Sequence, residues 1–330
     1  MTTVLYAFFL PLLAAIGGTR LALIWLRHKQ ILDRPNDRSS HSQPTPRGGG
    51  LAVTPVILLA WIGLAVAGDG QPGLLVVLVG GAALFALSWL DDKGGLPARL
   101  RLAVHALAVA AGLIAMPADL LICQGWLPLW ADRLVAFGAW VWFLNLFNFM
   151  DGIDGISGVE TMAIAFGLAL LDSVVGDDAG SAQAVVIGAT ALGFLVWNWH
   201  PAKIFLGDSG SVPLGYLLGW LLLQAAGQGL WAPALILPAY YLTDATLTLG
   251  KRAWRGEHLL QPHRQHFYQR AVRGGASHAA VSGIILGADV LLVALALLGR
   301  TDPLPGLAGA VLTVILLLAY LNRLGKGAPP

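Results

Sequence analysis

The sequence predicts an all-α fold, a polytopic integral membrane helix bundle, and two observations support this prediction. Hydrophobic residues make up 57% of the 330 residues and charged residues only 12%, whereas an ordinary soluble domain is about a quarter charged. Apolar stretches of about 20 residues, the length that crosses a hydrocarbon layer about 30 Å thick, recur along the whole chain. We therefore expect residues 1–330 to form a single transmembrane domain.

The apolar stretches predict about 11 transmembrane helices. The first lacks a basic residue ahead of its apolar run and is longer than the core of a signal peptide, so we expect it to be retained. The division between the eighth and the ninth falls around Gly227 to Gly229. In chain order, the predicted spans lie near residues 3–26, 50–68, 72–90, 102–118, 132–149, 158–176, 182–200, 211–227, 229–248, 279–299 and 304–322.

The orientation of the bundle follows from its Lys and Arg residues, because basic connections tend to stay in the cytoplasm. Of the 20 basic residues, all except Arg20, Arg133 and Arg300 fall in connections on one predicted side. These connections are 27–49, 91–101, 201–210, 249–278 and the C-terminal end. The sequence therefore predicts the N-terminus outside and the C-terminus inside.

Five carboxylates fall on the predicted inner side, close to glycines: Asp91 and Asp92 in "DDKGG", Asp151 and Asp154 in "NFMDGIDGISG", and Asp208 in "FLGDSGS". An unpaired carboxylate at the edge of hydrocarbon is costly, so such residues usually line a polar functional cavity. The glycines of "DGIDG" remove side-chain bulk, which lets phosphate oxygens and a hydrated Mg²⁺ approach. This pattern indicates phosphate-ester or diphosphate chemistry at the inner surface. Simple solvation at the membrane boundary is the alternative for any one of them.

Five separated motifs, in order, resemble those of the polyprenyl-phosphate N-acetylhexosamine-1-phosphate transferases. This family includes the bacterial initiators of O-antigen, enterobacterial common antigen and teichoic acid assembly, and the peptidoglycan lipid I synthase. All five motifs fall in connections that charge alone places inside. They are "RPNDRSSHSQPTPRGGGLA" (34–52), "WLDDKGGLPARLRL" (89–102), "NLFNFMDGIDGISG" (145–158), "NWHPAKIFLGDSGSVPLG" (198–215) and "HRQHFYQR" (263–270).

The resemblance implies that a sugar 1-phosphate passes from a UDP-sugar to undecaprenyl phosphate, with release of UMP. The sugar could be N-acetylglucosamine, N-acetylgalactosamine or N-acetylfucosamine. Mg²⁺ is the implied cofactor, with Mn²⁺ as an alternative. We expect a UDP-N-acetylhexosamine, undecaprenyl phosphate and membrane lipids as partners, a homodimer as a further candidate, and no nucleic acid. The implied location is the bacterial inner membrane, with a cytoplasmic-side active site.

The resemblance also assigns roles to the carboxylates. Asp151 and Asp208 match the expected metal ligands, and Asp154 would handle the nucleophile or support the metal site. Asp91 and Asp92 match a pair that either takes the proton from the lipid phosphate or positions it. We favour positioning, because the second pKa of a phosphate is about 6 and much of the nucleophile is already dianionic at pH 7.

Four further residues are candidates for substrate binding. Asn145 and Asn148 share one helix face by their spacing and are expected to contact the donor or the metal, unless their amides only satisfy buried backbone. Lys203 could pair with diphosphate or simply extend to the interface. Arg47, followed by three glycines, could bind phosphate, and a plain turn is the alternative.

The connection 249–278 holds the last candidates, His263, Arg264 and His266, which we expect to bind the donor diphosphate and nearby sugar. The alternative is a basic loop that only fixes orientation. The lipid I synthases carry adjacent histidines here, whereas "PHRQH" separates them, which favours the amino-sugar initiators. A secondary transporter is the alternative from another class, because intramembrane acids beside glycine-broken helices also form ion sites. The acids lie at span ends, which argues against it.

Overall fold

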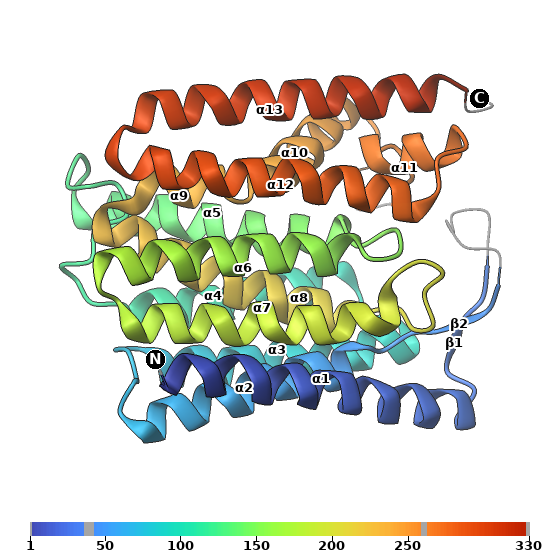
Figure 1. Ribbon diagram of the computed structural model, residues 1–330, viewed down its shortest axis with the longest axis horizontal. Coiled ribbons are helices and arrows are strands. Elements are labelled where there is room, and N and C mark those ends of the chain that lie inside the picture. Colours follow the sequence, from blue (N-terminus) through green and yellow to red (C-terminus); the bar gives the residue numbers. More distant parts are fainter. Residues whose placement is uncertain (1, 36–42, 259–262, 328–330) are drawn as a thin grey trace.

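A computed structural model describes residues 2–35, 43–258 and 263–327 and consists of long helices that run side by side (Figure 1). Among these residues, eight helices are long and apolar enough to cross a membrane. The chain is therefore an all-helical polytopic membrane protein. The eight are α1 (Thr2–His28), α2 (Gly50–Ala67), α3 (Leu74–Gly94), α4 (Ala98–Ala115), α6 (Ile156–Val175), α7 (Asp178–Asn198), α12 (His278–Thr301) and α13 (Pro303–Leu324).

A bent pair of helical segments adds a ninth candidate span within the described chain. Asp208–Ile236 and Ala239–Trp254 meet at an angle of 68°, on either side of Pro238, which has no N–H to continue a helix. The first segment contains a further irregularity at Gly229, whose φ is +92°, where the sequence predicts a division. The elements are α8 (Asp208–Ala225), the π-helical η1 (Ala226–Leu230), α9 (Trp231–Ile236) and α10 (Ala239–Trp254).

The helix α5 (Leu129–Phe149) also matches a predicted span but is not among the eight. It carries Asp132 and Arg133 near its start. The Asp132 carboxylate is buried and accepts hydrogen bonds from the backbone N–H groups of Ile122 and Cys123. The total of 11 spans therefore stays a prediction.

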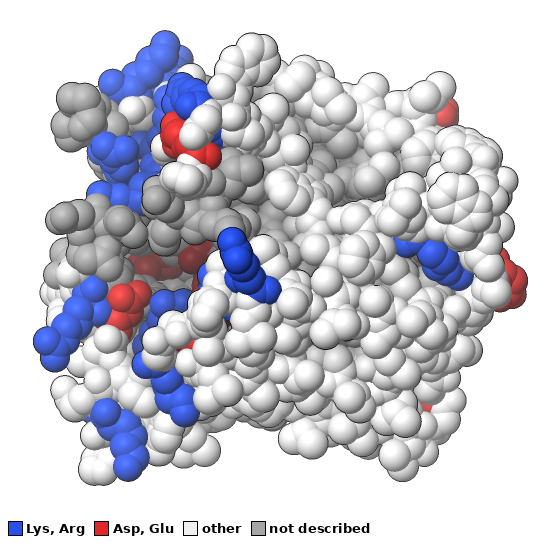
Figure 2. All heavy atoms as spheres, turned by 180° about the vertical axis from the view of Figure 1, so that it is seen from behind, with Lys and Arg blue, Asp and Glu red and all other residues white. Residues whose placement is uncertain are grey.

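Charge and small elements gather at one end of the bundle. The short strands β1 (Leu32–Asp33) and β2 (Thr45–Pro46) pair antiparallel at the same end as α11 (Phe267–Arg273), η2 (Gly325–Gly327) and the end of α13, whereas α1 begins at the opposite end (Figure 1). Figure 2 shows Lys and Arg concentrated at one end of the visible face, with acidic residues among them and a largely uncharged middle. The basic connections that the sequence places on one side of the bundle thus gather at one end of it (Figure 2).

The helix α8 lies in the core, and every residue from Ser209 to Ala225 is buried. It packs against α3 and α5, where the Trp140 ring stacks on that of Tyr216 with centroids 4.8 Å apart. Glycine permits this close packing, because a Cβ on Gly112 of α4 would lie 2.6 Å from the Trp140 ring. The consequence for the site is that Asp208, the first residue of α8, is held at the charged end by a rigid element.

Candidate active site

The N-terminus of α8 is capped by a carboxylate from α3. Asp92 accepts hydrogen bonds from the backbone N–H groups of Asp208 at 2.9 Å and Ser209 at 3.0 Å. These N–H groups have no partner within the helix, and the positive end of the helix dipole favours an anion there. Gly207 has φ +74° and a Cβ on it would lie 2.8 Å from Asp92, so glycine is required on both counts. Asp92 and Asp208, far apart in sequence, are therefore in direct contact.

Arg47 joins the same two carboxylates. Its Nε lies 3.0 Å from Asp92 Oδ1 and its Nη2 lies 2.5 Å from Asp208 Oδ1. The glycines after Arg47 form an ordered turn, because the N–H groups of Gly48 and Gly49 both donate to the carbonyl of Phe205. The Arg47 side chain is 37% exposed, so part of it remains open to solvent while its Nε and Nη2 hold the acids.

Arg101 supplies a second cation, which the sequence reasoning did not select. Its Nη1 lies 2.6 Å from Asp91 Oδ2 and 3.3 Å from Asp208 Oδ2. The other oxygen of Asp91 accepts from the N–H of Leu96 at 2.5 Å. Arg101 belongs to the same sequence motif as Asp91 and lies ten residues further on, in the first turn of the next helix. Its place in this motif is the signal that could have identified it as a site residue. Asp208 consequently lies between two guanidinium groups.

Both asparagines line a small cavity of about 40 Å³ beside Arg101 and Asp208. Asn148 accepts a hydrogen bond from the Ser211 hydroxyl at 2.5 Å. Asn145 donates to the carbonyl of Val141 at 2.7 Å, and its oxygen lies 3.0 Å from Nδ1 of His105. Asn145 is thus largely engaged within the protein. Asn148, by contrast, contacts Ser211 in the first turn of α8, the helix that begins at Asp208.

Asp151 lies in the turn between α5 and α6. The residue as a whole is half-buried. Burial of its carboxyl group raises its pKa to about 6, with the neighbouring carboxylates Asp208 and Asp92 acting in the same direction. Arg47 and the Ser157 hydroxyl oppose this rise without cancelling it. The basic side chains nearby do not fully stabilise the anionic form of Asp151. An added cation would therefore stabilise it further.

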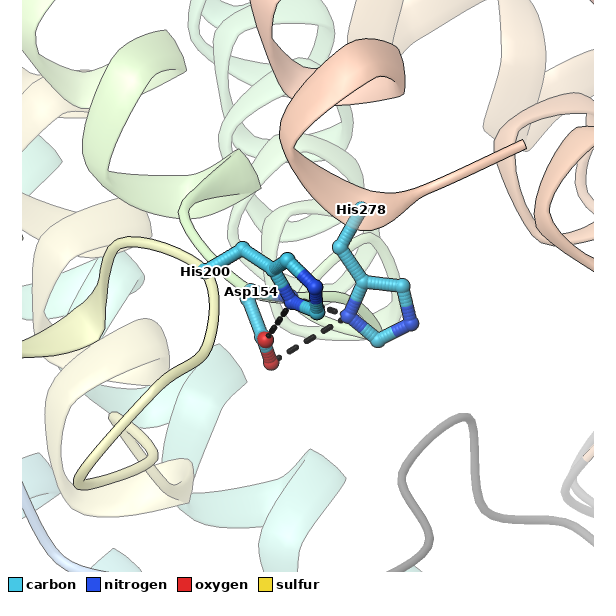
Figure 3. Close-up of side chains that lie close together, drawn as sticks. All are labelled: Asp154, His200 and His278. Atoms are coloured by element: carbon cyan, nitrogen blue, oxygen red, sulfur yellow. Dashed lines mark hydrogen bonds and ion pairs between the residues drawn. The ribbon is translucent and has the colours of Figure 1, made fainter.

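Asp154, only three residues further on, belongs to a different cluster (Figure 3). One of its oxygens lies 2.6 Å from Nδ1 of His200 and the other 3.3 Å from Nδ1 of His278. The N–H of Ala202 also donates to it at 3.1 Å. Burial alone would raise the pKa of Asp154, but the hydrogen bonds from His278 and His200 bring it below its ordinary value. The sequence reasoning selected neither histidine.

In the connection after α10, the side chain of His266 is buried against Asp244. Its side chain is 2% exposed and its Nδ1 lies 3.1 Å from Asp244 Oδ1. Asp244 also accepts from the N–H of Phe267 and from the Tyr240 hydroxyl, so it ties the start of α11 to α10. The Asp244 carboxylate is therefore occupied by contacts within the protein.

The other two candidates in this connection are more accessible. His263 and Arg264 are partly exposed, and the His263 ring lies 4.8 Å from that of His266. Burial, together with His266 and Arg252, lowers the pKa of His263 to about 4. His263 is therefore neutral at pH 7 and can offer a hydrogen bond to a phosphate, but no charge.

The lowered pKa of His263 predicts a pH effect on stability. The unfolded chain takes up a proton on this histidine as the pH falls below about 6.5, whereas the folded state resists protonation down to about pH 4. Stability should therefore fall as the pH falls through this window, and the His263→Ala variant should lose less. In detergent, the melting temperature of both proteins should be lower at pH 5 than at pH 7. We expect this decrease to be smaller in the variant than in the parent, by about 2–4 °C. Equal losses would contradict the assignment.

Lys203 lies at the surface. Its side chain is exposed and its Nζ stands 5.3 Å from the Trp197 ring centroid. This cation–π contact is typical of a lysine at a membrane interface, and it leaves the ammonium group accessible to an anion.

Comparison with known proteins agrees with this arrangement. Residues 74–226 match glycosyl transferase family 4. The chain is 30% identical to the decaprenyl-phosphate N-acetylglucosaminephosphotransferase of Mycolicibacterium smegmatis, over 89% of this chain and 83% of the relative. It is 26% identical to the probable undecaprenyl-phosphate N-acetylglucosaminyl 1-phosphate transferase of Bacillus subtilis, over 84% and 80%. It is also 32% identical to the phospho-N-acetylmuramoyl-pentapeptide-transferase of a Synechococcus strain, over 86% and 88%.

The bundle with its acid and arginine cluster at one end is a multi-pass membrane protein of the phosphosugar transferase class. The chain belongs to glycosyl transferase family 4. The matched segment runs from α3 to η1 and so includes all five carboxylates, both asparagines and Arg101. Arg47 and the connection after α10 lie outside it.

Proposed function

We propose that this protein transfers an N-acetylated sugar 1-phosphate from a UDP-sugar to undecaprenyl phosphate, with release of UMP. The reaction would begin the assembly of O-antigen or another cell-surface polysaccharide. The relatives support a sugar-phosphate donor and a polyprenyl-phosphate acceptor. The observation that carries the proposal is the meeting of Asp92, Asp208 and Arg47, from three separated motifs, at the start of a buried helix. A soluble nucleotide and the phosphate of a membrane lipid can both reach such a helix end.

Mg²⁺ is the proposed cofactor, with Mn²⁺ as an alternative, and Asp151 and Asp208 are the proposed ligands. The donor set fits, because Mg²⁺ is commonly held by one or two carboxylates together with substrate phosphates and waters. The raised pKa of Asp151, about 6, also indicates a carboxylate whose anion a cation would stabilise. When bound, the ion would neutralise charge on the diphosphate and on the departing UMP oxygen.

Two further carboxylates, Asp92 and Asp91, are assigned to holding parts of the site in position. Asp92 already accepts two backbone hydrogen bonds and pairs with Arg47, so we assign it to fixing α8 and Asp208. Asp91 and Arg101 are paired at 2.6 Å and are assigned to orienting the lipid phosphate. A strong base is not required, because that phosphate is largely dianionic at neutral pH.

Donor binding is proposed for Asn148, Lys203 and the connection after α10. Asn148 lines the cavity beside Asp208, and Arg264, with its fork of donors, is suited to diphosphate. His263 would add a neutral hydrogen bond and Lys203 a charge at the rim. His266 contributes by holding α11 against Asp244, and its loss would act through stability.

The site is proposed to face the cytoplasm of a bacterium from its inner membrane, with the N-terminus outside. The support is the gathering of Lys and Arg at the site end of the bundle (Figure 2), because basic connections are retained on the cytoplasmic side. A cytoplasmic site also gives a nucleotide-sugar donor direct access.

Cysteine labelling in intact cells tests this orientation. In a background with Cys123→Ala, we expect Asp178→Cys to react with a membrane-impermeant thiol reagent and Arg99→Cys to stay unlabelled until the cells are opened. Both positions are exposed, so a difference reports sidedness. Labelling of Arg99→Cys in intact cells would invert the topology and remove the donor from reach of the site.

Turnover of the purified protein tests the function itself. UMP release should require both undecaprenyl phosphate and one member of a panel of UDP-N-acetylhexosamines. UDP-N-acetylmuramoyl-pentapeptide belongs in the panel, because one relative carries that transferase's name, and turnover with it alone would favour lipid I synthesis. No UMP release with any donor and lipid combination would overturn the proposal.

A further inference from the structure

Two histidines and one aspartate converge outside the arginine cluster (Figure 3). Asp154 precedes α6, His200 follows α7, and His278 is the first residue of α12. One ligand atom from each residue, the carboxylate oxygen of Asp154 and a ring nitrogen of each histidine, lies within 4.8 Å of the others. Three segments distant in sequence are therefore joined at a single point.

The donor set is that of a transition metal. Two imidazole nitrogens and one carboxylate oxygen suit Zn²⁺ and related divalent ions, whereas Mg²⁺ prefers oxygen ligands alone. Three protein ligands with one open position are also the usual arrangement of a zinc site that binds a water or a substrate. With bonds of about 2.1 Å, ligand atoms in a tetrahedral site stand roughly 3.4 Å apart. The 3.3 Å contact of Asp154 with His278 matches this spacing, and the 2.6 Å contact with His200 would lengthen when an ion binds.

The surroundings of the cluster fit a metal centre in two further respects. The side chains of Asp154 and His278 are 7% and 9% exposed, while that of His200 is 37% exposed, which gives an entry path from solvent. Asp154 is also fixed from outside, because the Ala202 N–H donates to its carboxylate at 3.1 Å and the Ser282 hydroxyl donates to its backbone carbonyl at 2.8 Å. Such supporting hydrogen bonds hold ligands in place in metal sites.

We propose that Asp154, His200 and His278 bind a divalent transition-metal ion, with Zn²⁺ as the best match, at a site separate from the carboxylates assigned to Mg²⁺. The ion would replace the contacts of both histidines with the Asp154 carboxylate and the hydrogen bond that the Asp154 N–H donates to Nδ1 of His278, and it would lock α6, α12 and the end of α7 together. Because Asp154 and Asp151 share one short turn, the ion would also fix the backbone that carries Asp151.

Metal binding can be measured without turnover, so the outcome is independent of the proposed function. The full chain, purified in detergent with an affinity tag free of histidine and stripped with EDTA, is titrated with Co²⁺ while its visible d–d absorption is followed. After dialysis against Zn²⁺, metal content is measured by mass spectrometry. We expect about one ion per chain, and a Kd at least about tenfold higher in His200→Asn and His278→Ala. The exposed His28→Ala is the matched control and should bind as the parent does.

The choice of His200→Asn separates binding from folding. The asparagine amide can still donate to Asp154 from nearly the place of Nδ1, so this variant should melt like the EDTA-stripped parent. Zn²⁺ should then raise the melting temperature of the parent and of His28→Ala but not that of His200→Asn. Zinc content at background in the parent, or Co²⁺ spectra and affinity unchanged in both cluster variants, would overturn the proposal and leave the three residues as a hydrogen-bonded brace.

Discussion

The Asp208→Asn variant is expected to transfer sugar phosphate at least about 10²-fold more slowly than the parent, while remaining folded. The change removes one charge without changing the volume of the side chain, at a carboxylate that lies between Arg47 and Arg101 and is assigned to Mg²⁺. Asp151→Asn should fall by a similar factor. Initial rates of UMP release at saturating donor and lipid measure both, over a range of Mg²⁺ concentrations. Excess Mg²⁺ should not restore either rate fully, because geometry is lost together with affinity.

Asp178→Asn is the control for this pair. Asp178 is exposed at the opposite end of the bundle, so the same loss of charge there should leave the rate within about twofold of the parent. Turnover of either site variant close to that of Asp178→Asn, at ordinary Mg²⁺ concentrations, would rule out a metal-binding role for the residue concerned.

The Asp92→Asn variant is expected to lose stability as well as activity. The Asp92 side chain is fully buried and accepts from two N–H groups of α8, and one oxygen becomes a donor in the variant. Because Arg47 is 37% exposed, loss of its pairing with Asp92 should cost less than the roughly 3–5 kcal/mol of a fully buried ion pair, and loss of the helix cap should cost about 1 kcal/mol. The melting temperature in detergent should therefore drop well below those of the parent and of Asp178→Asn.

A comparison with Asp91 sharpens this test. Asp91 accepts from a single N–H group, that of Leu96, and its side chain is 8% exposed whereas that of Asp92 is 0% exposed, so Asp91→Asn should melt closer to the parent. If Asp92→Asn instead keeps the parent's melting temperature and loses only activity, the capping role is wrong and Asp92 acts on the substrate.

The overall architecture could be predicted because hydropathy and basic residues report directly on the surrounding solvent. The meeting of Asp91, Asp92 and Asp208 at one end followed from the same reasoning, since each stands at the inner end of a predicted span. The sequence predicts a break at Gly229 but not the bend at Pro238, because a broken span and two separate spans have similar composition.

The pairing within the site could not be predicted in the same way. Asp151 and Asp154 are three residues apart, yet they belong to different clusters, because Asp151 lies just after the end of α5 and Asp154 just before the start of α6. His200 and His278 meet Asp154 only through the packing of α6, α7 and α12. His266 carried the same sequence signal as His263. Only the buried position of Asp244 distinguishes them, because it holds His266 at the start of α11 and leaves His263 open to a ligand.

The salt-bridge network around Asp208 has a consequence for the order in which ligands arrive. Asp91, Asp92, Asp151 and Asp208 outnumber Arg47 and Arg101, and both guanidinium groups are already paired with carboxylates. A nucleotide diphosphate approaching alone would meet a surplus of negative charge at close range, where repulsion is strong. We infer that the proposed divalent cation would enter before the donor or together with it, so that electroneutrality, as well as shape, would control access to the site.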